Sequence, residues 1–397
     1  MKIKFSECVK YMVKGPFGSD MKKSLYVPKG EDTYKVYVQG NAIQKDENLG
    51  DYYIQSEYFH QKLKRFEVHP GDYIITCDGT LGKYIKLSEN IERGVISSSL
   101  LLLKLDEEVI YDKYFELLWD NSMLSYLASQ ARNACLVHLP SAKTIGEIII
   151  NLPELSVQRE MADKAFLIVN IIQQRNKELS MLDDLIKARF VEMFGDMYLN
   201  SKGWSEAKLE SMADVVSGIT KGRKTKSEDL TEVPYMAVSN VKDGYIDWTT
   251  VKTIEATQQE IEQYRLLADD VLMTEGGDPD KVGRGAIIKE PLENCIHQNH
   301  IFRVRLDESV VLPEFFAEYL QHQRSKRYFL GCAKQTTGIA SINMTQLRAL
   351  PVLIPPLSKQ EEFVLFKSQV DKSKVEVQKA LDETQKLFDS LMQQYFG

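Results

Sequence analysis

The sequence is poor in the features that mark secreted, membrane-bound and metal-cluster proteins. Its 397 residues include only five cysteines, widely spaced and without a CxxC pair, which argues against a disulfide framework or a zinc ribbon. The N-terminal MKIKFSECVK lacks the apolar core of a signal peptide. The longest apolar run, LLLL at 100–103, is far shorter than the ~18 residues of a membrane span. We therefore expect a cytoplasmic protein whose cysteines are reduced, buried thiols.

The motifs of common enzymes are also missing from the sequence. There is no GxxxxGK[ST] phosphate loop, no HExxH zinc helix and no GxSxG nucleophile elbow. No Asn-Pro-Pro-aromatic or Asp-Pro-Pro-aromatic tetrad for amino methylation occurs, and GGDPDK at 276–281 breaks that pattern. His297 and His300 have no acidic or cysteine ligand at helical spacing, so we expect polar residues around a strand there. The sequence thus predicts no catalytic residue, no metal site and no cofactor bound by this chain.

The formal net charge is −7, which argues mildly against a free-standing DNA-binding protein, since affinity for phosphate comes largely from Lys and Arg. Net charge does not describe how charge is distributed, however, and locally basic stretches are present. An acidic balance also suits a protein partner on another face. Charge alone therefore leaves both a DNA-binding protein and a protein-interaction scaffold open.

An internal repeat is the most informative feature of the sequence. LPELSVQRE at 152–160 matches IPPLSKQEE at 354–362, 202 positions later. The same spacing holds without an insertion to the ends of both segments, as shown by Pro153 and Pro355, Gln158 and Gln360, Leu179 and Leu381, Phe194 and Phe396, and Gly195 and Gly397.

Each repeated segment has the pattern of one long helix. Ser156 is a suitable N-cap for residues 156–195, and apolar residues recur every seven positions without an intervening Gly or Pro. The two rows are Ala165, Ile172, Leu179, Ile186 and Met193 with Met161, Ile168 and Leu182 in the first segment, and Phe363, Val370, Val377 and Leu391 with Leu381, Phe388 and Tyr395 in the second. About 38 residues give a rod of ~57 Å. We expect the two helices to pair antiparallel; the alternative is that each is a core helix of its own domain.

The regions before the helices correspond more loosely, at offsets of 198 to 201. The matching stretches are GDYIIT (71–76) with DDVLMT (269–274), LGKYIKL (81–87) with VGRGAIIK (282–289), LLKLDEEV (102–109) with RVRLDESV (303–310), and Asn41 with Asn240. Short β-rich runs such as YKVYV, YIIT and SSSLLLLKL alternate with turns, and helices are predicted at 111–130 and 313–330. The predicted fold is α+β, with two mixed α/β globules separated by two long helices. The predicted boundaries are 1–152, 153–199, 200–353 and 354–397.

These residues resemble a known family, the specificity subunits of type I restriction–modification systems. TTGIASINMTQLRALPVLIPPLSKQEEF (336–363) resembles the end of a target-recognition domain that runs into a conserved helix, and IKARFVEMFGD resembles the central conserved region. GWSEAKLESMADVVSGITKG (203–222), VPYMAVSNVKDGYID (233–247) and CIHQNHIFRVRL (295–306) resemble the start and interior of a second such domain. SQARNACLVHLPSAKTIGEIII (129–150) departs from the TTGIASIN wording of the second half.

The resemblance implies a non-catalytic subunit in which each globule reads half of a gapped double-stranded DNA target and the helices fix the gap. It further implies two methyltransferase partners that bind S-adenosylmethionine and, in a full complex, restriction subunits that use ATP with Mg²⁺. The remaining alternatives are a two-headed scaffold that binds proteins, and an enzyme with unfamiliar motifs.

Polar loops are the candidates for DNA contact, because Lys and Arg meet phosphates and base edges while glycine lets the backbone approach. Each loop has an alternative interpretation as an ordinary solvated turn. The candidates are Gly15, Gly18, Ser19, Lys22 and Lys23 in KGPFGSDMKK; Thr80 and Lys83; Lys221, Arg223 and Lys224 in SGITKGRKTK; Arg284; and Lys334, Gln335 and Thr336.

Overall fold

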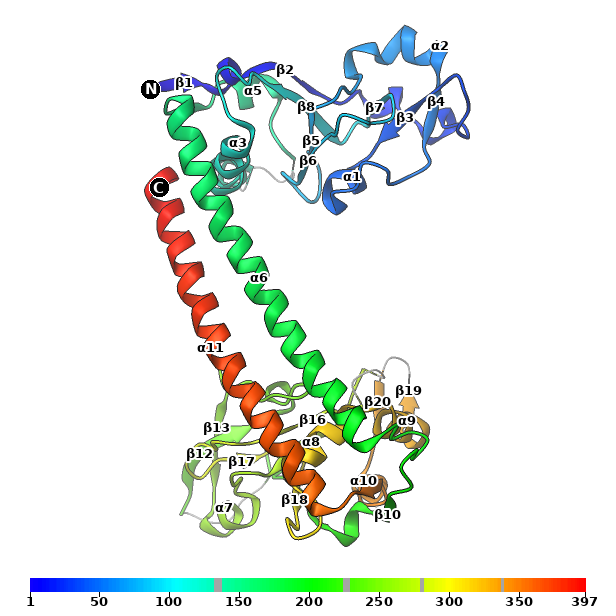
Figure 1. Cartoon of the computed structure of the whole chain (residues 1–397), viewed down its shortest axis with the longest axis vertical. Coiled ribbons are helices and arrows are strands. Elements are labelled where there is room, and N and C mark those ends of the chain that lie inside the picture. Colours follow the sequence, from blue (N-terminus) through cyan, green and yellow to red (C-terminus); the bar gives the residue numbers. More distant parts are fainter. Residues whose placement is uncertain (132–137, 224–228, 279–281, 337–338) are drawn as a thin grey trace. The chain divides into compact units, whose positions relative to one another are not determined.

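The computed structural model describes residues 1–131, 138–223, 229–278, 282–336 and 339–397. The chain divides into two compact units, residues 1–175 with 380–397 and residues 176–379. Each unit combines a mixed α/β globule with one end of each of two 40-residue helices, α6 (Leu155–Phe194) and α11 (Leu357–Phe396) (Figure 1). The predicted α+β fold class is confirmed.

The first unit contains a four-stranded antiparallel sheet in the order β2-β8-β5-β6, a three-stranded sheet β4-β3-β7 and the pair β1-β9. The strands are β1 (Lys2–Lys4), β2 (Val9–Lys14), β3 (Thr33–Tyr37), β4 (Tyr53–Gln55), β5 (Tyr73–Thr76), β6 (Tyr84–Lys86), β7 (Gly94–Ile96), β8 (Leu100–Leu105) and β9 (Ile149–Asn151).

The run of leucines in β8 is explained by burial of both faces of this strand. Leu101 and Leu103 pack into a core with the helical residues Phe115 and Trp119. Leu100 and Leu102 point the other way, into a core shared with the three-stranded sheet. Side chains alternate along a strand, so a strand buried on both faces has a continuous apolar sequence.

The second unit repeats these sheets strand for strand, in the orders β11-β18-β14-β16, β13-β12-β17 and β10-β21. It also has a small sheet, β15-β20-β19. The repeat inferred from loosely matched stretches is therefore a repeat of topology. The strands are β10 (Ser205–Lys208), β11 (Ala213–Ser217), β12 (Thr231–Met236), β13 (Lys252–Ala256), β14 (Val271–Thr274), β15 (Gly276–Gly277), β16 (Gly285–Ile287), β17 (Ile296–His297), β18 (Ile301–Leu306), β19 (Lys334–Thr336), β20 (Ile339–Ser341) and β21 (Pro351–Ile354).

Helices cover one face of the four-stranded sheet in each unit. The helix predicted at 111–130 is continuous, as α3 (Asp112–Leu118), a π-helical turn over Trp119–Met123 and α4 (Leu124–Ala131). The helix predicted at 313–330 is instead interrupted at His322, whose backbone is extended (φ −81°, ψ 157°), and forms α8 (Pro313–Gln321) and α9 (Gln323–Cys332). The shorter helices are α1 (Gln39–Gln44), α2 (Ser56–Tyr58), α5 (Ala142–Gly146), α7 (Gln258–Tyr264) and α10 (Met344–Arg348).

The long helices α6 and α11 pair antiparallel, as the heptad rows predict. In the second unit Arg189 bonds Glu362 at 2.9 Å and Asp183 bonds Lys374 at 2.5 Å, so the order of partners runs in opposite directions along the two helices. In the first unit Ala165 of α6 and Met392 of α11 belong to one core. The predicted seam positions are buried or half-buried in both helices.

One detail of the helix prediction is wrong. Helix α6 begins at Leu155, so Ser156 lies inside its first turn and is not its N-cap. The first helical hydrogen bond runs from the Gln158 amide to the Glu154 carbonyl at 2.9 Å, directly after Pro153. None of the helices in the described part of the chain combines the length and the apolar character that a bilayer crossing needs.

Three of the four described cysteines are buried, as expected, and Cys332 is half-buried. Cys8, Cys77, Cys295 and Cys332 are free thiols, the first three buried, and burial raises the pKa of each of those three to about 12. Cys135 lies outside the described residues.

Candidate nucleic-acid interface

The register of the four-stranded sheet brings the candidate loops of the first unit to one end of it. Lys14 at the end of β2 pairs with Leu101, and Thr76 at the end of β5 pairs with Leu100, so both strands finish beside the start of β8. The loops that follow, at 15–23 and 77–83, therefore emerge at the same end, about 10 Å apart across two strand spacings. This loop end holds Gly15, Gly18, Ser19, Thr80 and Lys83.

The loop at 15–23 is a tight turn fixed at both sides. A Cβ added to Gly15 would lie 2.0 Å from the Ser97 carbonyl oxygen, so this position needs glycine for contact with the protein's own backbone. Gly18 starts a 3₁₀ turn (Gly18–Asp20), and its missing Cβ would face open space. Ser19, Lys22 and Lys23 are exposed. The structure thus explains Gly15 without DNA, while the other four candidates remain free for contact.

The loop at 77–83 is closed by its own hydrogen bonds. The Thr76 hydroxyl donates to the Thr80 carbonyl and accepts from the Lys83 amide at 3.0 Å. The ring of His138 lies 2.6 Å from the Asp78 carboxylate, which ties the loop to the strand bridge at that position. The side chains of Thr80 and Lys83 are exposed.

In the second unit, the candidate loops lie at the equivalent end of the equivalent four-stranded sheet. Ser217 pairs with Phe302 and Thr274 with Ile301, so β11 and β14 finish beside the start of β18. Gly218 repeats the role of Gly15, since an added Cβ would lie 1.9 Å from the His297 carbonyl oxygen.

The Arg223 side chain does not project freely from this loop. It forms a bidentate pair with Glu260 of α7, with N···O distances of 2.5 and 2.6 Å, and donates to the Glu255 carbonyl at 3.0 Å. This pairing raises the pKa of Arg223 and lowers the pKa of Glu260 to about 2. The SGITKGRKTK stretch itself contains no acidic residue, and the carboxylate that pairs with Arg223 lies 37 positions away in sequence. Lys221 is exposed, and Lys224 lies outside the described residues.

Lys83 and Arg284 occupy equivalent positions in the two units. Thr76 donates its amide to the Lys83 carbonyl at 2.8 Å, and Thr274 donates to the Arg284 carbonyl at 3.1 Å. Lys83 and Arg284 each follow a glycine with positive φ, which is 73° for Gly82 and 71° for Gly283. Within the described residues, the Arg284 Nε is buried without a hydrogen-bond partner.

The third candidate stretch forms β19 of the small sheet in the second unit. Lys334, Gln335 and Thr336 pair with β20, which pairs in turn with β15. Since β15 directly follows β14, this stretch joins the same loop end, and the Lys334 side chain is exposed.

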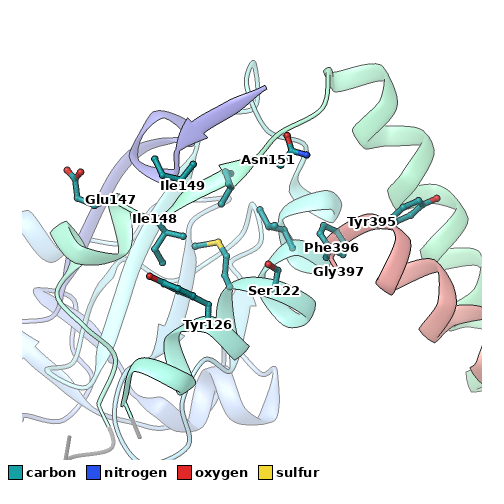
Figure 2. Close-up of a pocket in the computed structure, with 12 residues that line it drawn as sticks. Ser122, Tyr126, Glu147, Ile148, Ile149, Asn151, Tyr395, Phe396 and Gly397 are labelled. Atoms are coloured by element: carbon teal, nitrogen blue, oxygen red, sulfur yellow. The ribbon is translucent and has the colours of Figure 1, made fainter. Parts of the chain in front are cut away.

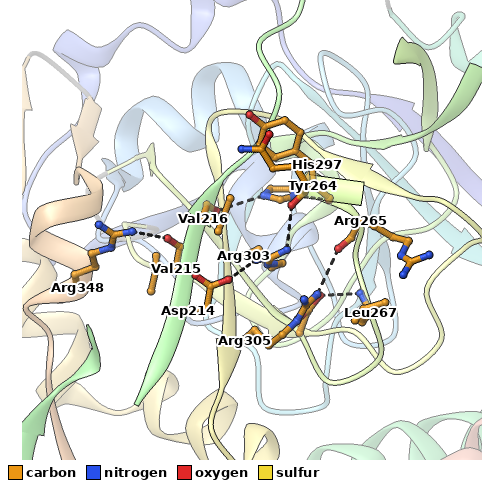
Figure 3. A network of polar contacts seen from close by, with 12 residues as sticks. Asp214, Val215, Val216, Tyr264, Arg265, Leu267, His297, Arg303, Arg305 and Arg348 are labelled. Carbon is orange, nitrogen blue, oxygen red and sulfur yellow. Dashed lines mark hydrogen bonds and ion pairs between the residues drawn. The ribbon is translucent and has the colours of Figure 1, made fainter. Parts of the chain in front are cut away.

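His297 lies on strand β17, and its side chain is buried. Its Nδ1 lies 3.1 Å from the Tyr264 carbonyl and its Nε2 lies 3.4 Å from that of Val216 (Figure 3). Burial lowers the pKa of this imidazole to about 4, so the ring is neutral at pH 7. His300 instead faces Glu275 at 2.5 Å. The described ranges contain no group of three or more His, Cys, Asp or Glu side chains able to hold a metal ion.

A cavity of about 430 Å³ lies in the first unit beside Phe396 at the end of α11, lined among others by Tyr126 and Ile148 (Figure 2). In the second unit, Phe194 at the end of α6 occupies the position equivalent to Phe396. Met197, three residues further along the chain, is buried, with 3% of its surface exposed. The cavity includes none of the candidate DNA-binding residues, so it is separate from the loop end.

One exposed residue of the loop end was missed from the sequence. Phe17 is 77% exposed between a buried Pro16 and Gly18. The available signal was an aromatic residue inside a Pro-Phe-Gly turn of a candidate loop, where most turn positions are polar.

Comparisons with known proteins agree with this architecture. Residues 201–385 match the model of the type I restriction modification DNA specificity domain. The chain is 23% identical over 266 residues to the type I restriction enzyme EcoKI specificity subunit of Escherichia coli K12, covering 63% of this chain and 57% of that protein. It is 20% identical over 371 residues to the EcoBI specificity subunit of Escherichia coli, covering 85% of this chain and 76% of that one. The EcoKI match thus leaves over a third of that relative unaligned.

Two solved structures share the fold over the whole chain. One chain, from work on complex assembly and conformational transition of the type I R-M system, superposes with a TM-score of 0.61 at 15% identity, covering 100% of this chain and 97% of that one. The S subunit of a type I restriction-modification system from M. genitalium superposes with a TM-score of 0.53 at 13% identity, covering 100% and 96%. The matched domain over residues 201–385, the relatives and the duplicated topology thus make this chain similar to the DNA specificity subunits of type I restriction–modification systems.

Proposed function

We propose that this chain selects the DNA sequence on which a type I restriction–modification complex acts. Each globule contacts one half of a gapped duplex target through its loop end, and the chain itself carries out no chemical step. The observation that supports this most is that two sheet frameworks with equivalent strand orders end in loops of different sequence. Such a pair suits a reader of two different half-sites.

The loop ends offer the groups that duplex DNA requires. Exposed Lys22, Lys23 and Lys83 in the first unit and Lys221 and Lys334 in the second can contact phosphates, which position a protein on DNA. The DNA sequence is then read through protein contacts with the base edges in a groove. Net charge of −7 need not oppose this, because net charge does not describe how charge is distributed, and these five exposed lysines lie at the loop ends.

The two helices are proposed as a spacer that sets the separation of the half-sites, as dimer geometry does in symmetric readers. We further propose two methyltransferase subunits as partners, which would bind S-adenosylmethionine and methylate an extruded adenine in each half-site. Restriction subunits would supply ATP and Mg²⁺ chemistry in a complete complex.

A selection experiment tests the DNA-reading role directly. The chain, in complex with its methyltransferase subunits, is incubated with random duplex DNA, and the retained DNA is sequenced. We expect a two-part motif with a constant gap, bound with an affinity that falls steeply as salt rises. A complex that retains no motif and whose weak binding ignores salt would favour a protein-interaction scaffold.

A further inference from the structure

The inference concerns Phe17, the most exposed large hydrophobic residue in the described part of the chain. Its side chain is 77% exposed. Single exposed apolar residues are common and need no explanation by themselves. Phe17 differs because of how its backbone is held and where it lies.

The turn that carries Phe17 is anchored on both sides. Before it, the Gly15 amide donates to the Leu100 carbonyl at 2.8 Å, and Pro16 is buried. After it, the Asp20 amide donates to the Phe17 carbonyl at 2.8 Å, and Met21 is 7% exposed in the core. The Tyr58 hydroxyl also donates to the Asp20 carbonyl at 3.0 Å. The backbone is therefore preorganised, and the ring projects from it at little further cost in conformational entropy.

The surroundings of Phe17 are polar and cationic, unlike those of an apolar docking patch. Ser19, Lys22 and Lys23 follow it in the same loop and are all exposed. An aromatic ring flanked by phosphate-binding groups matches the way proteins insert apolar side chains into base steps while cations hold the backbone.

The second unit has a different residue on the same frame. Gly218 corresponds to Gly15 and the buried Ile219 to Pro16, so the exposed Thr220 stands where Phe17 stands in the first unit. The repeat has kept the glycine and the buried residue that precede the tip, and the exposed tip itself changes from an aromatic ring to a small hydroxyl. A change of an exposed tip on a retained base points to the ligand rather than to folding.

We infer that the Phe17 ring stacks into the base column of the first half-site, while Thr220 makes no such insertion in the second. Phe17 is thereby a specificity-determining residue, because the cost of opening a base step depends on the sequence of that step. This inference rests on the proposed function.

The test uses the complex of the full chain with its methyltransferase subunits and its selected target DNA. Phe17→Ala should weaken target binding roughly tenfold or more, as loss of base–aromatic stacking does. The salt dependence should stay unchanged, because no charge is removed. Phe17→Trp should retain affinity. Ile149→Ala, which removes a 59% exposed apolar side chain from β9, should bind as the wild type.

A fluorescent base locates the insertion. 2-Aminopurine placed at successive positions of the first half-site should brighten at one step with wild type and Phe17→Trp, and stay quenched with Phe17→Ala. Unchanged melting of each variant excludes misfolding. If the wild type binds with a steep salt slope but Phe17→Ala matches it in affinity and fluorescence, the inference is overturned and DNA reading stands. If the wild type selects no DNA at any salt concentration, the proposed DNA-reading function and the Phe17 inference both fail.

Discussion

Gln158 and Gln360 occupy the same position in the two halves of the chain and make the same three hydrogen bonds. The Oε1 of Gln158 accepts from the Tyr111 amide at 2.8 Å, and its Nε2 donates to the carbonyls of Val109 and Pro153 at 3.1 and 2.9 Å. Gln360 repeats these contacts with Leu312, Val310 and Pro355 at 2.9, 3.1 and 2.9 Å. Both side chains are fully buried. Each amide thus joins the start of a long helix to the globule before it.

Replacing either glutamine by leucine should destabilise its own unit strongly. Gln158→Leu removes the partner of one half-buried amide and two half-buried carbonyls, which we expect to cost on the order of 2–4 kcal/mol. Gln360→Leu should cost a similar amount. Urea unfolding measures both, with Gln173→Leu as the control, because Gln173 is exposed on the same helix as Gln158. Midpoints equal to that of the control would show that the two amides are dispensable.

His297 should make the second unit sensitive to acid. Burial lowers the pKa of the folded imidazole from 6.5 to about 4. Between these values the unfolded chain binds a proton that the folded chain does not, so stability falls as pH drops from 6.5 toward 4. The loss is about 3 kcal/mol. His297→Gln should reduce this dependence without abolishing it, because burial also lowers the pKa of His322 in the same unit to about 4. Parallel stability curves for wild type and His297→Gln between pH 4 and 7 would refute the assignment.

Lys83 and Arg284 should each contribute one phosphate contact. Removing either by alanine substitution should reduce the slope of log K against log salt by about one, and should weaken binding to all targets alike. Lys10→Ala serves as the control, because Lys10 is exposed at the opposite end of β2. Equal salt slopes for Lys83→Ala, Arg284→Ala and wild type would place DNA elsewhere on the chain.

The helices should act as a ruler for the gap between half-sites. Removing one heptad from the middle of both α6 and α11 keeps the seam in register and shortens each helix by about 10 Å, or about three base pairs. Selection from random DNA should then return the same half-sites with a shorter gap. An unchanged gap would exclude the helices as the spacer.

Periodic and repeated features were predictable from the sequence. The heptad rows gave both long helices to within about a residue at each end, because helix pairing demands a regular apolar seam. The matched stretches placed equivalent strands at the same positions in both sheets, including GDYIIT with DDVLMT in β5 and β14. Asn41 and Asn240 likewise accept equivalent backbone hydrogen bonds, from Val38 and Ala237.

Features that depend on tertiary contacts were not predictable. The Arg223–Glu260 pair joins a loop to a distant helix, and local sequence showed only a basic loop. Gly15 looked available for DNA until the Ser97 carbonyl was placed against it. The break at His322 has no Gly or Pro to announce it, since the residue after Gln321 simply adopts an extended backbone. Phe17 was overlooked because exposure of an aromatic residue cannot be read from its neighbours alone.

The most direct test of the central claim is a methylome. Cells that co-express this chain with its methyltransferase subunits are compared, by single-molecule sequencing, with cells that express the methyltransferase subunits alone. We predict a new gapped motif, methylated on both strands and present only with this chain. Exchange of residues 1–152 for another recognition domain should then alter one half of that motif. A soluble complex with active methyltransferase subunits and no new motif would contradict the claim that this chain reads DNA sequence.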